Sequence, residues 1–193
     1  PAEGKHSASI VICHGLGDSA DGFADVAELL CKQFPYLKAI LPSAKTQPVT
    51  VNMGSSCPSW YDITGLDAAS SESVEGIDES VAVVRGIVDS EISLGILPSR
   101  IILAGFSQGG MMSLHCGLRL NPAPAAVISF SGALLRYDDL TKNPASPYPP
   151  VQLVHGTDDE VVPFALMSEA SRILQPLGVL VETIERRGLG HGI

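Results

Sequence analysis

Apolar runs and amphipathic runs alternate along the chain. Near-continuous apolar segments, typical of buried strands, lie at residues 7–13, 39–41, 101–103, 125–130, 151–154 and 179–184. Apolar residues recur at helical spacing over residues 21–34, 74–94, 107–120 and 164–177. Strands that are apolar throughout and alternate with helices are typical of a mostly parallel sheet with helices on both faces. The pattern therefore predicts the α/β class.

Two polar segments interrupt this alternation. Residues 43–73 are rich in Ser, Pro, Thr, Gly and Asn, yet they contain the only tryptophan, within Ser59-Trp60-Tyr61-Asp62. Residues 134–150 are polar and contain four prolines. We expect no regular structure in the first segment. Because a long loop inside a compact domain is usually functional, and because it carries an aromatic pair, we expect it to form an ordered wall.

A nucleophile motif follows the apolar run at 101–103. Gly105-Phe-Ser107-Gln-Gly109 has the form Gly-x-Ser-x-Gly and precedes a helical pattern. In this setting it predicts a nucleophile elbow, a tight strand-to-helix turn that lifts the serine oxygen clear of the backbone. The glycines leave room for the strained turn. The strand–turn–helix context, more than the motif alone, makes Ser107 the candidate nucleophile.

The candidate base is found by elimination. A serine hydroxyl needs a base that is itself oriented by an acid, and in the α/β-hydrolase order both follow the serine along the chain. Three histidines follow Ser107. His115 lies in the helix behind the elbow and is expected in the core, whereas His155 ends the strand that must supply the acid. His191, between glycines after the last strand, is the candidate base.

The acid must lie between Ser107 and His191, at the end of a strand. Asp158 and Asp159 both follow the run at 151–154, and either could accept the imidazole N–H. The residues alone leave this choice open. Other acidic residues in the interval are expected on solvated surfaces, namely Asp138, Asp139, Glu169, Glu182 and Glu185.

Acyl transfer also needs two donors for a tetrahedral oxyanion. One is expected to be the backbone N–H of the residue after the nucleophile, Gln108. The other should come from the loop after an early strand, where His14-Gly-Leu16-Gly-Asp lies, and we assign it to the N–H of Leu16. His14 is expected to hold this turn.

Composition narrows the classes of partner. The 193 residues carry 21 acidic and 12 basic side chains, a net charge of −9, and no Lys or Arg cluster stands out, so nucleic acid is not an expected partner. A hydrophobic content of 45% indicates a large core, and no apolar run approaches the ~18 residues of a bilayer span. We expect one domain over 1–193, without stable membrane insertion. The first residues lack the features of a secretory signal.

The cysteines and histidines give no sign of a disulfide framework or a metal site. Four scattered cysteines without a C-x-x-C pair predict reduced thiols and a cytoplasmic location. Because no His, Asp or Cys cluster has the spacing of metal ligands, we expect no metal and no other cofactor.

Five motifs together resemble the acyl-protein thioesterase, lysophospholipase and small carboxylesterase family of α/β hydrolases. They are Gly105-Phe-Ser-Gln-Gly-Gly110, His14-Gly-Leu-Gly-Asp18, Pro58-Ser-Trp-Tyr-Asp62, His155-Gly-x-x-Asp159-x-x-Val-Pro163 and Gly188-Leu-Gly-His191. The resemblance covers nearly the whole chain. It implies an α/β-hydrolase fold with Ser107 as nucleophile, His191 as base and Asp159, the fifth residue of His-Gly-x-x-Asp, as acid. The backbone N–H groups of Leu16 and Gln108 take the oxyanion positions.

The chain departs from the family pattern in two places. Family members usually continue past the catalytic histidine into a final helix, whereas this chain ends at Ile193, so we expect either that a C-terminal helix is missing from the sequence or that the protein lacks a packing element that helps to hold His191. The segment from Ser131 onward also differs from the endings common in the family, which affects the expected chain-length preference.

The resemblance implies an acyl substrate in an open site. The connection at 133–150 is too short for the cap domain of many lipases. Leu16, Met53 and Trp60 are candidate walls for an acyl chain, and Met111 and Leu134 are either walls or core.

The leading hypothesis is a serine thioesterase that removes palmitoyl groups from proteins, because the segments 49–53 and 58–60 resemble the thioesterase branch. The alternatives are a general carboxylesterase or lysophospholipase acting on short to medium esters, and an inactive ligand-binding scaffold. Expected partners are an acylated protein or a lipid or ester substrate, with at most a weak homodimer.

Overall fold

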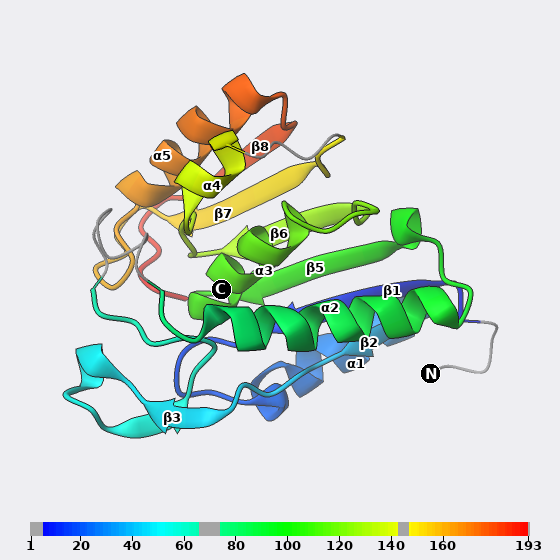
Figure 1. The fold of residues 1–193 in the computed structure, drawn as a ribbon, viewed down its shortest axis with the longest axis horizontal. Helices are drawn as coiled ribbons and strands as arrows, with labels where there is room; N and C mark the ends of the chain where they lie inside the picture. Colours follow the sequence, from blue (N-terminus) through cyan, green and yellow to red (C-terminus); the bar gives the residue numbers. More distant parts are fainter. Residues whose placement is uncertain (1–5, 66–73, 143–146, 193) are drawn as a thin grey trace.

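The central sheet has six parallel strands in the order β2-β1-β5-β6-β7-β8 (Figure 1). The computed structural model describes residues 6–65, 74–142 and 147–192. The strands are β1 (Ala8–Cys13), β2 (Leu37–Ile40), β5 (Ile101–Phe106), β6 (Ala126–Phe130), β7 (Val151–Gly156) and β8 (Val181–Arg186). The mostly parallel sheet predicted from the apolar runs is confirmed, and the strand register aligns Cys13 with Gly105 and Phe106 with Phe130. The loops that follow these strands therefore meet at one edge.

Helices cover both faces of the sheet, as predicted (Figure 1). One face carries α1 (Ala24–Gln33), which is preceded by the 3₁₀ turn η1 (Ala20–Phe23). The core on this face includes Ile10, Ile12 and Ala104 of the sheet. The other face carries α2 (Ile77–Ser93), α3 (Gln108–Gly117), α4 (Tyr137–Lys142) and α5 (Ala165–Leu174). Successive residues of β1 thus point to opposite layers, which is why the strand is buried throughout.

The helix predicted at 74–94 is present as α2 and buries one apolar face. In α2, Ile77, Val84 and Val88 are buried, and Val81 packs at the margin of the same core. Full burial of each such side chain contributes about 1.5–3 kcal/mol. The spacing of these apolar residues along the helix therefore determines which face of α2 packs on the sheet beside α3.

The segment predicted as an irregular wall contains a small antiparallel pair. Strand β3 (Thr46–Pro48) pairs with β4 (Ser56–Pro58), and the 3₁₀ turn η2 (Thr50–Asn52) lies between them. The Asp62 carboxylate accepts hydrogen bonds from the N–H and the hydroxyl of Thr50, both at 2.7 Å, and buried Val49 anchors the turn. The expectation of no regular structure was wrong here, because side-chain hydrogen bonds and one anchor stabilise strands too short to show a pattern. Residues 66–73 of the predicted loop lie outside the described residues.

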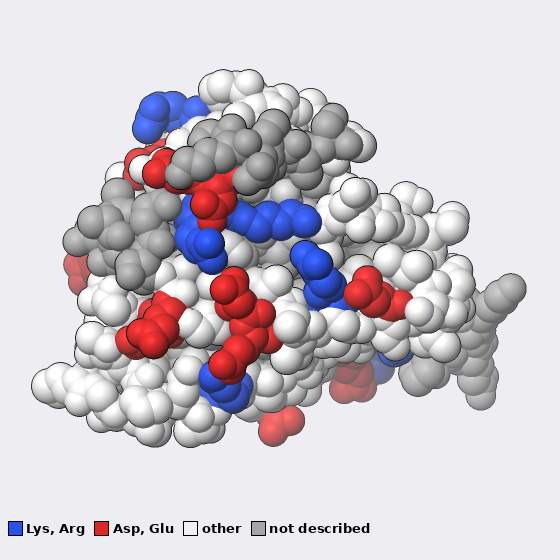
Figure 2. Space-filling view, in the orientation of Figure 1, with Lys and Arg blue, Asp and Glu red and all other residues white. Residues whose placement is uncertain are grey.

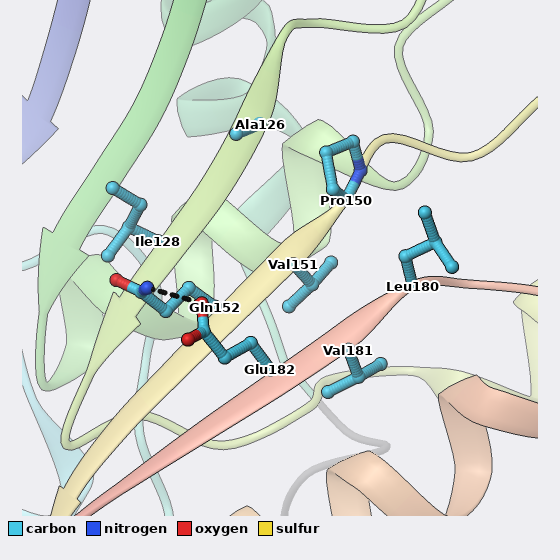
Figure 3. A pocket seen from close by; sticks show the side chains of 8 residues that line it. All are labelled: Ala126, Ile128, Pro150, Val151, Gln152, Leu180, Val181 and Glu182. Atoms are coloured by element: carbon cyan, nitrogen blue, oxygen red, sulfur yellow. Dashed lines mark hydrogen bonds between the residues drawn. The ribbon is translucent and has the colours of Figure 1, made fainter.

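A hollow of about 370 Å³ lies on the α1 side of β6, β7 and β8 (Figure 3). Its floor includes Ile128 and Gln152, and the amide of Gln152 donates to Glu182 at 2.7 Å. Leu180, at its rim, is 77% exposed. This hollow is thus separate from the sheet edge that carries the Ser107 elbow.

Charged side chains of both signs are mixed on the face that carries α2 to α5 (Figure 2). Arg136 pairs with Asp139 at 2.9 Å and with Asp78 at 3.5 Å, and Lys45 pairs with Glu79. Figure 2 shows basic and acidic groups side by side among the described residues of this face. No helix in the described part of the chain is long and apolar enough to cross a bilayer.

Candidate active site

Ser107 occupies the turn between β5 and α3. Its backbone has φ 54° and ψ −122°, a conformation that residues other than glycine rarely adopt. The turn is fixed from both sides, because the Ser107 N–H donates to the Phe130 carbonyl at 2.8 Å and its carbonyl accepts from Met111 at 3.0 Å. The predicted elbow is therefore present, and it holds strain at the predicted nucleophile.

The two glycines of the motif are required by close contacts. A Cβ on Gly105 would lie 2.2 Å from the Gly109 carbonyl oxygen, and a Cβ on Gly109 would lie 2.1 Å from that of Cys13. Both distances are far shorter than van der Waals contact. The glycines therefore let α3 begin directly against the ends of β1 and β5.

A chain of hydrogen bonds joins the three residues predicted to form a triad. Nε2 of His191 lies 2.9 Å from the Ser107 hydroxyl oxygen, and Nδ1 lies 2.8 Å from Oδ2 of Asp159. An ionised carboxylate can only accept, so Nδ1 carries the proton and donates to Asp159. Nε2 is then the acceptor for the hydroxyl proton of Ser107, which is the arrangement a general base requires.

The carboxylate of Asp159 is buried and fully engaged. Its Oδ1 accepts from the N–H groups of Val161 and Val162 at 2.9 and 2.8 Å. Burial raises the pKa of this carboxyl, but the hydrogen bonds from His191 and the two N–H groups outweigh it, so the pKa lies below its ordinary value. Asp159 therefore stays ionised beside the imidazole.

The neighbouring Asp158 has a different environment. It is exposed and accepts from the Thr157 hydroxyl at 2.8 Å. Of the two aspartates that the residues alone left open, the structure brings Asp159 to His191, as the family pattern implies.

The loop that carries His191 is fastened to the end of β7. The Asp158 N–H donates to the Leu189 carbonyl at 3.0 Å, and the Gly188 N–H donates to the Thr157 hydroxyl at 3.0 Å. The imidazole ring also packs against Phe106, with ring centroids 4.9 Å apart. The hydrogen bonds to the end of β7 and the contact with Phe106 thus hold the imidazole ring in place.

The two predicted oxyanion donors lie on either side of Ser107. Gln108 is the first residue of α3, so its N–H has no partner carbonyl within the helix. Leu16 is half-buried in the turn after β1, and no acceptor in the described part of the chain binds its N–H. A Cβ on the adjacent Gly15 would lie 3.5 Å from the Cβ of Ser107, which places this turn directly against the nucleophile.

The predicted substrate walls divide into two groups. Trp60, Met111 and Leu134 are at most 6% exposed and belong to the core. Trp60 therefore presents no open wall, since its indole is used inside the protein. Met53 is 97% exposed beside η2, and Leu16 is half-buried beside Ser107.

The other histidines have supporting positions. His14 accepts the Ala44 N–H at 3.0 Å through Nε2, and its Nδ1 lies 2.7 Å from the Gly15 carbonyl, as expected for a residue that holds the turn. His155 is buried with Nε2 2.8 Å from the Val162 carbonyl and 3.2 Å from Oδ2 of Asp159. His115 is buried in α3, as expected; burial and then the charge of Arg119 lower its pKa to about 3.

The sequence-based predictions missed the roles of two side chains. His155 was excluded as a base but not expected beside the acid, although its place in the His-Gly-x-x-Asp pattern was a signal. The side chain of Gln108 was not considered, yet it is 1% exposed and bonded to the segment 59–61. A polar residue inside an otherwise apolar helix start was the available signal.

The four cysteines are free, and Cys13 and Cys116 are buried. Burial raises the pKa of the Cys13 thiol to about 12, so it is not a rival nucleophile. Within the described residues, no group of three or more His, Cys, Asp or Glu side chains is arranged to hold a metal ion.

The sequence profile of the phospholipase/carboxylesterase family matches residues 1–193. This chain belongs to that family. It is 36% identical over 202 residues to acyl-protein thioesterase 1 of Gibberella zeae, covering 99% of this chain and 86% of the relative. It is 34% identical to lysophospholipase-like protein 1 of Mus musculus, with 97% and 81% covered. The structure is similar to the crystal structure of Arabidopsis thaliana SOBER1, with a TM-score of 0.86, 29% identity, and 97% and 91% of the two chains covered.

Membership of the phospholipase/carboxylesterase family agrees with the α/β-hydrolase fold and with a serine hydrolase site. It also agrees with acylated or lipid substrates as a class. Which acyl compound the protein cleaves is a narrower question.

Proposed function

We propose that this protein is a serine thioesterase that removes long acyl groups, such as palmitoyl, from cysteine side chains of proteins. The observation that carries the proposal is the hydrogen-bonded chain from Ser107 through His191 to buried Asp159, set on a strained elbow. The name of the Gibberella zeae relative, acyl-protein thioesterase 1, favours the thioester over other acyl bonds.

The proposed reaction has two halves. The Ser107 oxygen attacks the thioester carbonyl while Nε2 of His191 takes the hydroxyl proton. The N–H groups of Leu16 and Gln108 stabilise the oxyanion, the C–S bond then breaks, and the cysteine thiol leaves with the proton from His191. Water repeats the sequence on the acyl-serine, which releases the fatty acid and restores Ser107. Asp159 keeps the imidazole oriented and stabilises its charged form throughout.

Two features support a bulky acyl substrate. The connection from β6 to β7 contains α4, a helix of six residues, so the described part of this connection carries no cap domain. Leu16 lies half-exposed beside Ser107, and Met53 is exposed on the neighbouring β3–β4 segment. Burial of acyl methylenes against such residues contributes about 0.8 kcal/mol each.

The second candidate function is a carboxylesterase or lysophospholipase, favoured by the name of the Mus musculus relative. The test compares kcat/KM for a palmitoyl-cysteine peptide, lysophosphatidylcholine and p-nitrophenyl butyrate. We expect the thioester to be preferred; a preference for butyrate or for the lysolipid would replace the first proposal with the second. Labelling by a fluorophosphonate probe, lost in Ser107→Ala, tests whether the site is active at all.

We also propose a cytoplasmic location and at most a weak homodimer. Four free cysteines in a chain of this size support a reducing compartment. Imaging of the tagged protein tests the location, and sedimentation over a range of concentrations tests association.

A further inference from the structure

The side chain of Gln108 is buried and makes hydrogen bonds at both ends of its amide. Oε1 accepts the Trp60 N–H at 3.0 Å, and Nε2 donates to the Tyr61 carbonyl at 2.9 Å and to the Ser59 hydroxyl oxygen at 3.0 Å. The Ser59 hydroxyl in turn donates to the Tyr61 carbonyl at 2.6 Å. The residue whose backbone is the expected second oxyanion donor is thus locked to the segment 59–61.

The same segment is bonded to the loop that carries the other donor. The Trp60 indole N–H donates to the His14 carbonyl at 2.8 Å, and the Gly17 N–H donates to the Pro58 carbonyl at 2.9 Å. These two bonds lie on either side of Leu16. The segment 58–61 therefore contacts both loops between which an oxyanion would lie.

The strands alone do not fix these two loops. Cys13 is the last paired residue of β1 and Phe106 the last of β5, so Leu16 lies three residues and Gln108 two residues beyond the sheet ladder. The separation of their N–H groups depends on contacts made after the strands end. Segment 58–61 supplies such contacts, and buried Trp60 presents no surface to a substrate.

We propose that the Trp60 indole N–H and the Gln108 side-chain amide are positioning groups that set the spacing of the two oxyanion N–H donors. This inference rests on the proposed function, but it does not depend on which acyl group is cleaved. Neither side chain touches the substrate; each acts through the backbone of the loop it holds. Displacement of a donor by about 1 Å lowers a rate by up to about 100-fold.

The experiment uses Trp60→Phe, which removes the bond to the His14 carbonyl, and Gln108→Met, which removes the amide and keeps the length. Both are assayed on the ester that the wild type hydrolyses best. We expect kcat to fall roughly 10- to 100-fold with KM nearly unchanged. Affinity for a trifluoromethyl ketone, whose adduct with Ser107 presents an oxyanion, should fall in proportion, while the pH profile of kcat/KM keeps its shape because His191 and Asp159 are untouched.

Val88→Ala is the control for a general loss of stability. Val88 is buried in α2 and its side chain carries no hydrogen-bonding group, so its truncation should lower the melting temperature without changing kcat well below that temperature. If Trp60→Phe and Gln108→Met behave like Val88→Ala, the positioning role is wrong. A rise in KM at constant kcat would also overturn it, since that result indicates a substrate wall.

Gln47→Met keeps the proposal testable if the two buried variants do not fold. Half-buried Gln47 donates from its amide to the Ser59 carbonyl at 2.8 Å, outside the core. We expect a smaller fall in kcat, about 2- to 5-fold, with the same pH profile; unchanged kcat would contradict the inference. A wild type that hydrolyses no ester and does not react with a fluorophosphonate would overturn the proposed function itself, and the positioning role with it.

Discussion

Asp159 holds His191 with one carboxylate oxygen and is itself held by the other. Oδ2 accepts from Nδ1 of His191 at 2.8 Å, and Oδ1 accepts from the N–H groups of Val161 and Val162. Because two backbone donors fix the carboxylate plane, the imidazole has a fixed orientation toward Ser107. The carboxylate of the adjacent Asp158 contacts the Thr157 hydroxyl instead and does not bind His191.

Replacement of Asp159 by Asn should lower kcat by about four orders of magnitude, because a neutral amide can stabilise the wrong tautomer of the imidazole. The matched control is Asp158→Asn, at the exposed neighbouring position, which should keep kcat within about 2-fold because it alters no triad contact. Steady-state kinetics of the two variants decide the assignment. Equal losses in both, or a loss only in Asp158→Asn, would refute the role of Asp159.

Asp159 should stay ionised well below neutral pH. The pKa of this carboxyl lies below its ordinary value of 3.8, because the hydrogen bonds from His191 and from the N–H groups of Val161 and Val162 outweigh its burial. A lowered pKa means that the carboxylate remains the acceptor for Nδ1 of His191 as the pH falls to about 5. We expect the carboxyl 13C resonance of Asp159, assigned by its loss in Asp159→Asn, to show no protonation step between about pH 7 and 5. A step in that interval would contradict the lowered pKa.

The central sheet, its main helices, the candidate nucleophile and the candidate base could be predicted because their signals are local, whereas the choice of Asp159 over Asp158 needed the family pattern. The apolar runs, the glycines around Ser107 and the position of His191 after the last strand each follow from chain order and backbone geometry. The role of Trp60 could not be predicted, because it depends on hydrogen bonds to residues 46 and 48 positions away. A tryptophan in a polar loop indicated a surface wall, whereas its two N–H groups place it between the elbow and the β1 loop.

The elbow should lower the stability of the protein. At φ 54°, any residue with a Cβ is strained at position 107, and such strain costs on the order of 1–3 kcal/mol. Ser107→Gly relieves the strain, whereas Ser107→Ala keeps the Cβ. We expect both variants to be inactive. The Gly variant should be more stable than the Ala variant by about 1 kcal/mol, which is less than the full strain because glycine also gains conformational freedom in the unfolded chain. Urea unfolding measures this difference, and an Ala variant of equal or greater stability would argue against stored strain.

A buried carboxylate joins α2 to the sheet far from the site. Glu91 is 2% exposed and accepts from Lys38 of β2 and from the Ser9 hydroxyl of β1, both at 2.6 Å, with Nε2 of His6 3.2 Å away. Burial raises the pKa of Glu91, but the hydrogen bonds and charge of its partners outweigh it, so the pKa lies below the ordinary 4.5. A lowered pKa means that this carboxylate stabilises the fold above its unfolded pKa. That contribution is lost as the pH falls through the folded pKa.

Glu91→Gln should therefore lower the free energy of unfolding at neutral pH by about 2–4 kcal/mol, somewhat less than for a fully buried pair because Lys38 is partly solvated. Below pH 4.5 the difference from the wild type should narrow, since the wild-type carboxylate is being protonated there. The control is Glu28→Gln, whose exposed pair with Lys32 should change stability by no more than the experimental error. Unfolding curves for the three proteins at pH values on both sides of this window measure the effect. Parallel stability curves for the wild type and Glu91→Gln would show that the buried carboxylate is not the source of the acid sensitivity.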